Sequence, residues 1–247
     1  MLTHRSTLCY LVTVLFLFAA ILAGCSNIET GQAMNEPTPS LLGLPSVHTT
    51  VELTPAPTPT PVILGPLFDS SIDLMAGPIE VPIELRIPSL KVKAPILGVG
   101  LTSNNLMDTP RGLVGDTIWH MGYWYRGSGI PGEPGTATIA GHVNDPLADP
   151  EIFADLEDLD PGDQIIIYYS KLDIEIHFTV DQVKVYSVEE SSDPAVLAQI
   201  FGDGPVVGTG PQPARDGLSH LTLITCAGNI VNGQFDHHTV VYATRSK

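Results

Sequence analysis

Short runs of alternating apolar and polar residues, each bounded by turn residues, constrain the fold of this chain more than any other feature. Ile174, Ile176, Phe178 and Val180 alternate with polar neighbours, which is the pattern of a strand buried on one face, and this run is expected to extend to Val188. Further short runs rich in apolar and β-branched residues predict strands at 83–87, 92–99, 136–140, 164–169, 221–226 and 239–244. Together they predict a mostly β domain in the form of a small barrel.

Helix and turn signals lie between these runs. Two short helices are predicted, one over 150–159 capped by Asp149 and one over 194–201 capped by Asp193. Asp-Pro-Gly-Asp at 160–163 and the segment 170–173 predict turns on either side of the strand 164–169.

The N-terminal segment carries a targeting signal rather than fold signals. Arg5 precedes the apolar run 8–20, and Leu-Ala-Gly-Cys follows at 22–25. This tetrad resembles the lipobox of bacterial lipoproteins, which predicts lipidation of Cys25. The alternative is a single membrane-spanning anchor, because the run 8–24 is near the ~17-residue lower limit for a span.

Residues 26–77 form the second part of the predicted organisation. Prolines alternate there with threonine, alanine and leucine, most densely over 54–61, which is typical of a polyproline-like spacer that extends about 3.1 Å per residue. The expected domains are therefore a signal or anchor over 1–25, a linker over 26–77 and a folded domain over 78–247.

The charge balance excludes one class of partner. The chain has 27 acidic and 11 basic residues and a net charge of −16, so no basic face is available for nucleic acid. The same surface would not be drawn to anionic lipid head groups, and attachment to a membrane must come from the N-terminal anchor.

One cysteine stands apart from the N-terminal segment. Cys226 ends the strand 221–226, and with Cys9 in the apolar run and Cys25 the predicted lipidation site it has no partner for an intramolecular disulfide. An exported protein that keeps an unpaired thiol usually needs its reactivity, although a buried cysteine that acts as a small apolar side chain is the alternative. The strand 136–140 leads into Gly-His at 141–142, so the two strand ends predict a cysteine–histidine acyl-transfer site.

These residues resemble the sortases, a family of exported cysteine transpeptidases. The resemblance covers 82–243, and the Pro-Gly element at 131–132, ahead of the histidine, is most similar to the branch called class E or F. It implies an eight-stranded closed β-barrel with Cys226 as nucleophile, His142 as its acid–base partner and Thr225 as a substrate contact. The matching pieces are 85–88, 94–96, 107–110, 124–125, 127–135, 140–143, 153–163 and 222–226.

The implied chemistry fits the residue types. A thiol with an unperturbed pKa of ~8.5 is only a few per cent thiolate at neutral pH, so it needs a nearby imidazole or positive charge. Cys226 would attack a peptide carbonyl, and His142 would protonate the departing amine and then deprotonate the incoming one.

The sequence departs from the family at one position. Sortases carry an arginine on the last strand, where it hydrogen-bonds the substrate carbonyl or the developing oxyanion, and this chain has His238 there. Arg245 is no simple replacement, because seven residues along a strand span roughly 23 Å. Three alternatives remain open: His238 substitutes directly and activity falls as pH rises, Arg111, Arg126 or Arg215 comes in from a loop, or the protein is weakly active or inactive. Direct substitution by His238 is our hypothesis.

No cofactor and no metal are expected. Two adjacent histidines, His237 and His238, are a feature of some metal sites, but neighbouring strand residues face opposite ways and no further ligand cluster accompanies them.

The sequence thus predicts a membrane-tethered transpeptidase on the extracytoplasmic face of the cell membrane. Its substrates would be surface proteins with C-terminal sorting signals of the Leu-Pro-x-Thr-Gly kind, cleaved through a thioester on Cys226. The acceptor would be a cell-wall or pilin amine, or water. The alternatives are a catalytically weak or inactive sortase-fold module that binds surface peptides, and a hydrolytic cysteine peptidase.

Overall fold

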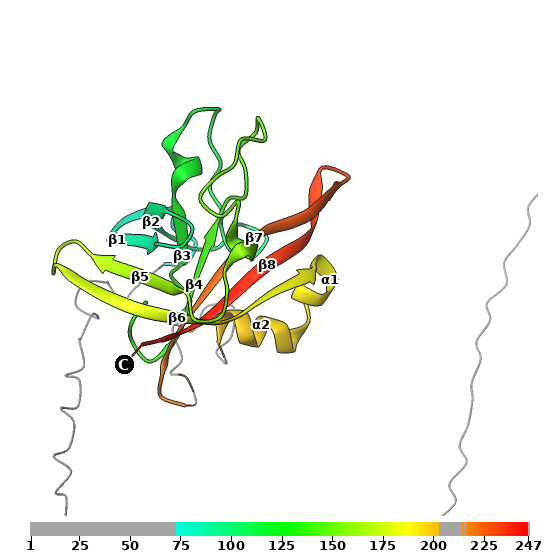
Figure 1. Ribbon diagram of the computed structural model, residues 1–247. Coiled ribbons are helices and arrows are strands. Elements are labelled where there is room, and N and C mark those ends of the chain that lie inside the picture. The colour runs from blue at the N-terminus through cyan, green and yellow to red at the C-terminus, as the bar shows by residue number, and fades with distance from the viewer. Residues whose placement is uncertain (1–72, 203–213, 215, 247) are drawn as a thin grey trace, which may run out of the picture. The chain divides into compact units, whose positions relative to one another are not determined.

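Eight strands close into a barrel in the part of the chain that the computed structural model describes, which is residues 73–202, 214 and 216–246 (Figure 1). Around the barrel they follow the order β1-β2-β3-β4-β7-β8-β6-β5. The predicted fold class, a mostly β, closed eight-stranded barrel with short helices, is confirmed. The strands are β1 Ile79–Ile87, β2 Val92–Val99, β3 Gly122–Tyr125, β4 Gly135–Gly141, β5 Gln164–Tyr169, β6 Ile174–Ser187, β7 Ser219–Val231 and β8 Gln234–Arg245.

The predicted N-terminal parts lie largely outside these residues. The segment 1–25, with Cys9 and Cys25, and the linker up to residue 72 are not among the described residues. Within the described ranges, no helix has the length and apolar character needed to cross a membrane.

The alternating pattern fills the barrel. Side chains at every second position of each strand enter one apolar core, with Leu85 and Ile87 of β1, and Ile165 and Ile167 of β5, wholly buried. Burial of each such side chain contributes about 1.5–3 kcal/mol to stability. Within this core the Trp124 indole N–H donates to the Gly129 carbonyl at 2.9 Å.

One predicted helix is confirmed and one strand end is corrected. Helix α2 spans Pro194–Phe201, and the Asp193 side chain accepts a hydrogen bond from the Ala195 N–H as expected for its cap. Val188 does not extend β6; it begins the short helix α1, Val188–Ser191. The reason is that Ser187 and Glu190 form a reciprocal capping box, which starts a helical turn at this point.

The predicted helix over 150–159 is wrong. Only a 3-10 turn, η3 Leu156–Asp158, forms there. The N–H groups of Glu151 and Phe153 donate to the carbonyls of Val143 and His142, so this backbone is bound to the chain that leaves β4 and forms only single turns instead of a continuous α-helix. The Phe153 side chain is completely buried in the barrel core, which holds the segment in place.

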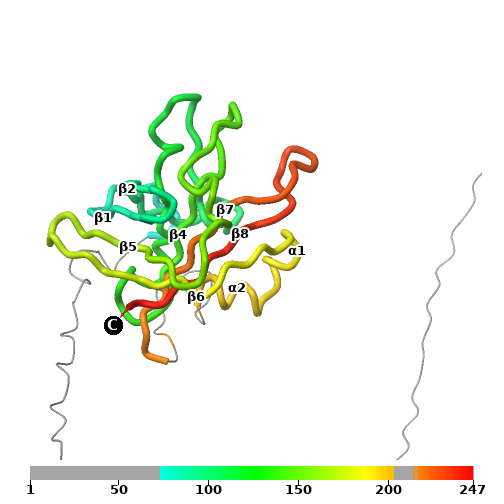
Figure 2. The backbone as a smooth tube through the Cα atoms, in the orientation of Figure 1, coloured from blue at the N-terminus to red at the C-terminus, as the bar shows by residue number. Residues whose placement is uncertain are grey.

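The expected turns form on either side of β5. The Asp163 N–H donates to the Asp160 carbonyl at 3.0 Å, and residues 170–173 form the turn between β5 and β6. A second 3-10 turn, η2 Thr117–His120, precedes β3. Figure 2 shows that the connection from β2 to β3 and the chain after β4 lie side by side beyond one end of the barrel.

Candidate active site

Three neighbouring strands bring Cys226, His142 and His238 into one row. β4 and β7 run parallel, with Ala140 opposite Ile224, so His142 and Cys226 each come two positions beyond this pair. β7 and β8 run antiparallel, and Cys226 lies directly opposite His238. Because adjacent strands are about 4.8 Å apart, the row places Cys226 between the two histidines.

The row lies on the outer face of the barrel. Leu221 and Leu223 of β7 point into the core, so alternation turns Ile224 and Cys226 outward. Val241 of β8 also points inward, which turns His238 outward beside the cysteine. The side chains that the sequence predicted for catalysis therefore share one surface.

His142 is held in a defined orientation. Its half-buried ring packs against the rings of Trp119 and Tyr123, with centroid distances of 4.6 and 5.3 Å. Its Nε2 lies 2.9 Å from the Pro110 carbonyl oxygen. Because a carbonyl can only accept a hydrogen bond, Nε2 carries the hydrogen, and Nδ1 is the nitrogen left to take up and release a proton.

Burial favours the neutral forms of both reacting groups. It lowers the pKa of His142 below its usual 6.5, and the positive charge of Arg111 lowers it further, against the Pro110 carbonyl and the Glu151 carboxylate, which raise it. Burial raises the pKa of the half-buried Cys226 thiol above its usual value, and the charge of Arg111 opposes this rise. The resting pair is therefore a neutral thiol and a neutral imidazole.

His238 is also neutral at pH 7, because burial and the neighbouring His237 lower its pKa. Its Nδ1 lies 3.0 Å from the Ser191 hydroxyl oxygen. That hydroxyl donates its single hydrogen to the Val188 carbonyl, so it accepts from His238 Nδ1–H. Neutral His238 then has no second N–H to offer a substrate carbonyl.

Thr225 links the two strands that carry the reacting groups. It is buried, and its hydroxyl donates to the Gly141 carbonyl at 2.9 Å. This bond joins β7 to β4 directly beside Cys226 and His142. The hydroxyl predicted to contact substrate is thus engaged by the protein.

A small pocket of about 210 Å³ opens beside the thiol. Phe153 and Phe235 supply aromatic walls, and Glu157 supplies a carboxylate. Its full lining is Val143, Phe153, Ala154, Glu157, Thr225, Cys226, Ala227, Gly228, Phe235 and Thr239.

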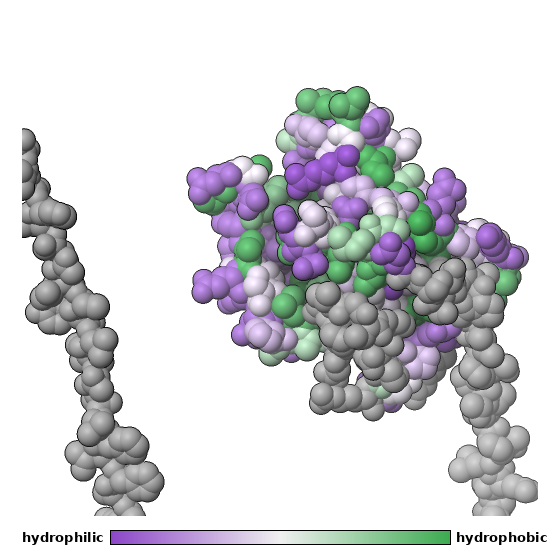
Figure 3. Space-filling view, turned by 180° about the vertical axis from the view of Figure 1, so that it is seen from behind, coloured by the Kyte–Doolittle hydropathy of each residue, from purple (hydrophilic) through white to green (hydrophobic). Residues whose placement is uncertain are grey.

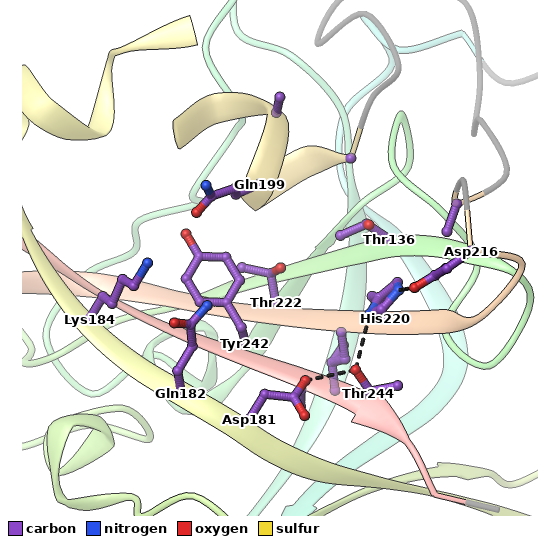
Figure 4. Close-up of a pocket in the computed structure, with 15 residues that line it drawn as sticks. Thr136, Asp181, Gln182, Lys184, Gln199, Asp216, His220, Thr222, Tyr242 and Thr244 are labelled. Carbon is purple, nitrogen blue, oxygen red and sulfur yellow. Dashed lines mark hydrogen bonds and ion pairs between the residues drawn. The ribbon is translucent and has the colours of Figure 1, made fainter. Parts of the chain in front are cut away.

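A larger pocket of about 490 Å³ lies further along β7 and β8, and no cysteine lines it. Figure 4 shows His220 at its edge, bonded through Nε2 to Asp216 at 2.9 Å and through Nδ1 to Thr244 at 3.1 Å. Thr222, which lines this pocket, is four residues from Cys226, or about 13 Å along the strand. The larger pocket is therefore separate from the reacting groups.

The loops around the row end in exposed apolar side chains. Leu113 is 80% exposed and Val114 53%, both in the connection from β2 to β3, and Leu147 after β4 is 64% exposed. In the space-filling view an apolar patch covers the top of the molecule, where that connection lies (Figure 3). The chain just after His142 has a local role: the Asp145 carboxylate accepts from the N–H groups of Leu147 and Asp149, as in a turn.

The arginines named as replacements occupy different places. Arg126 is buried and donates to the Ala76 carbonyl at 2.5 Å, and Arg245 donates to the Gly132 carbonyl at 2.7 Å. Arg215 lies outside the described residues. Arg111 directly follows Pro110, the residue that His142 binds. In the described part of the chain, no three potential metal ligands gather at one place.

Comparison with known proteins gives a family and several similar folds. A family model described as a sortase domain matches residues 85–246. Sortase A from Corynebacterium diphtheriae is similar at 23% identity and a TM-score of 0.45, over 67% of this chain but only 60% of that chain, which is less than two thirds of its length. A Clostridium perfringens sortase D5 transpeptidase is similar at 18% identity and a TM-score of 0.44, over 67% of this chain and 78% of that one. A pilus-related sortase C of Group B Streptococcus is similar at 22% identity and a TM-score of 0.43, over 67% and 66%. No curated protein matches the chain.

Proposed function

The chain belongs to the sortase family, and from that premise we propose that it is a membrane-tethered cysteine transpeptidase of the class E or F branch, acting outside the cytoplasm. It cleaves a C-terminal sorting signal of the Leu-Pro-x-Thr-Gly kind and transfers the acyl fragment to a cell-wall or pilin amine. Its tether is the N-terminal segment, through lipidated Cys25 or a single span. The observation that carries the proposal is the row of His142, Cys226 and His238 on one outer face of the barrel.

The reaction proceeds in two displacement steps. Cys226 transfers its proton to Nδ1 of His142, and the thiolate attacks the carbonyl carbon of the scissile peptide bond. The C–N bond breaks as His142 returns a proton to the departing amine, which leaves a thioester on Cys226. An incoming amine then gives a proton to His142, attacks the thioester carbonyl and releases the Cys226 thiolate.

The surface beside the thiol suits a peptide with apolar residues ahead of the scissile bond. Ile224 lies two positions before Cys226 on the same outer face and is only partly buried. It packs against two separate apolar clusters, one around Tyr123 and one around Ile200 of α2. Leucine and proline side chains of a sorting signal would bury apolar area on this floor.

His238 takes part in its protonated form. Only then does it carry an N–H on Nε2 as well as the Nδ1–H that Ser191 accepts, and only then can it donate to the substrate carbonyl. Since burial lowers its pKa, this contribution grows as pH falls.

A product assay with sorting-signal peptides tests the proposal. Wild-type protein incubated with peptides of the Leu-Pro-x-Thr-Gly kind and an oligoglycine or lysine-containing acceptor should yield the ligated product, and Cys226→Ala should yield none. Release of free acid alone, with acceptor present, would favour a hydrolytic peptidase instead.

The second candidate is a peptide-binding module of sortase fold without turnover. The neutral His238, whose Nδ1–H is held by Ser191, favours it, because a developing oxyanion would then lack a donor from β8. Peptide binding by wild type and Cys226→Ala alike, with no product from either, would identify this candidate.

A further inference from the structure

The strand position opposite Cys226 supplies no positive charge at neutral pH. His238 stands there with its pKa lowered by burial, and its Nδ1–H is used by Ser191. A buried thiolate and a developing oxyanion both gain from a nearby cation, because they lose their hydration in the site. A cation that serves the site at neutral pH must therefore come from another element.

Four arginines lie in the described residues, and three are engaged. Arg86 forms ion pairs with Glu84 and Glu175, each at 2.5 Å, while Arg126 and Arg245 donate to backbone carbonyls. Arg111 is exposed, and neither a hydrogen bond nor an ion pair to the rest of the described chain holds its guanidinium. It is thus available to a charge that forms during the reaction.

The backbone holds Arg111 beside the reacting groups. Pro110 accepts the hydrogen bond from His142 Nε2 at 2.9 Å, and Arg111 is the next residue. The same connection is fixed by the Tyr123 hydroxyl, which donates to the Ile118 carbonyl and has the Pro110 oxygen 3.4 Å away. Tyr123 itself is fully buried, so the base of the connection is rigid even though its tip at Leu113 is exposed.

We propose that Arg111 supplies the positive charge of this active site at neutral pH, where His238 of β8 is uncharged, and stabilises the Cys226 thiolate and the oxyanion from the connection between β2 and β3. This inference rests on the proposed transpeptidase function and names the residue that completes it. It selects one of the loop arginines that the sequence left as alternatives to His238.

The electrostatics of the site agree with this placement. The charge of Arg111 acts on both reacting groups, opposing the rise of the Cys226 pKa and lowering the His142 pKa. The other charged or titratable groups near the row are Glu151, which raises the pKa of His142, Glu157 in the pocket beside the thiol, and His237, which lowers the pKa of His238. Of these groups and Arg111, only the arginine carries a full positive charge at neutral pH.

The test is the pH dependence of Cys226 alkylation by iodoacetamide in the full-length protein. Modification is followed by mass spectrometry of the peptide that contains Cys226, so that Cys9 and Cys25 do not contribute. Because an opposite charge at close range shifts a pKa by about 1–3 units, Arg111→Gln should raise the thiol pKa by about one unit and slow alkylation at neutral pH roughly tenfold. Arg111→Lys should keep most of the wild-type rate.

A matched control is Lys171→Gln, which removes an exposed cation from the turn between β5 and β6 and should titrate as wild type. Arg111→Gln should also lower kcat/KM for a sorting-signal peptide by roughly tenfold. An Arg111→Gln protein whose Cys226 titrates as in wild type overturns the inference, whatever its activity. Wild-type protein that makes no ligated product while Arg111→Gln still shifts the thiol titration leaves the inference standing and refutes the proposed function.

Discussion

Gly141, the last residue of β4, is the position where a single methyl group should disturb catalysis most selectively. A Cβ placed there would lie 2.5 and 2.7 Å from two ring carbons of Phe153, whereas ordinary contacts begin at 3.4 Å. One side must therefore move by about 0.9 Å. The Gly141 φ is not positive, so the cost of Gly141→Ala is steric and not a matter of backbone strain.

Movement of either side reaches His142. The Phe153 ring is wholly enclosed in the barrel core, and its N–H is bonded to the His142 carbonyl at 3.2 Å. Gly141 precedes His142 directly, so a shift of the strand end moves His142, and a shift of Phe153 moves it through the bond to its carbonyl. Overpacking of this kind costs about 1–3 kcal/mol of stability, and a misplacement of about 1 Å in an active site lowers the rate roughly 100-fold.

The assay is kcat/KM for a sorting-signal peptide, with thermal unfolding measured on the same samples. Gly141→Ala should remain folded and lose roughly 100-fold in kcat/KM. Phe153→Ala in the same chain removes every side-chain carbon that the methyl group meets and should restore most of that loss, while Phe153→Ala alone serves as the control. A Gly141→Ala protein of normal activity, or a double variant no better than the single one, would refute the reasoning.

Three further predictions concern the hydrogen bonds and charges around the row. Thr225→Val removes the hydroxyl that donates to the buried Gly141 carbonyl. The free energy of unfolding, measured by urea denaturation, should fall by about 1–3 kcal/mol, whereas Thr225→Ser should keep most of the wild-type stability. The pH profile of kcat/KM should be a broad bell, because burial lowers the His142 pKa below 6.5 and raises the Cys226 pKa above 9.0. A narrow maximum between two closely spaced pKa values would contradict these shifts. Ser191→Ala releases His238 Nδ1, so that a neutral His238 can carry its hydrogen on Nε2, and kcat/KM above pH 7 should rise; an unchanged profile would remove the Ser191 bond from the account.

Period-two alternation allowed much of the barrel to be predicted. The predicted strand 164–169 has the bounds of β5, and the predicted helix 194–201 has those of α2, because each element carries its own local signal. The prediction of a helix over 150–159 failed because the backbone of this segment binds residues 142 and 143. Such a tertiary contact cannot be recognised in a local sequence pattern. β7 and β8 also run further than predicted, to Val231 and from Gln234, since cross-strand pairing alone extends the hairpin beyond the apolar runs.

The candidate active site, like the fold, could be predicted from the sequence only in part. His142 follows the end of β4 as the sequence predicts, whereas Cys226, predicted to end its strand, lies within β7, which continues to Val231. The register of β4 against β7 brings the two residues together. The partners that orient them could not be predicted. Pro110 acts through a backbone carbonyl, which any residue possesses, and Ser191 reaches His238 from a separate helix. The choice among the loop arginines depended on the same fact, since only the structure shows which one follows the carbonyl that His142 binds.

The central claim, a reactive thiol that takes a peptide acyl group, is tested most directly by the intact mass of the protein. Wild-type protein mixed with a sorting-signal peptide in the absence of acceptor and quenched with acid should gain the mass of the N-terminal peptide fragment. The adduct should map to Cys226 and be released by hydroxylamine, as a thioester is. Peptide cleavage without any adduct, or the same adduct on Cys226→Ala protein, would contradict the account.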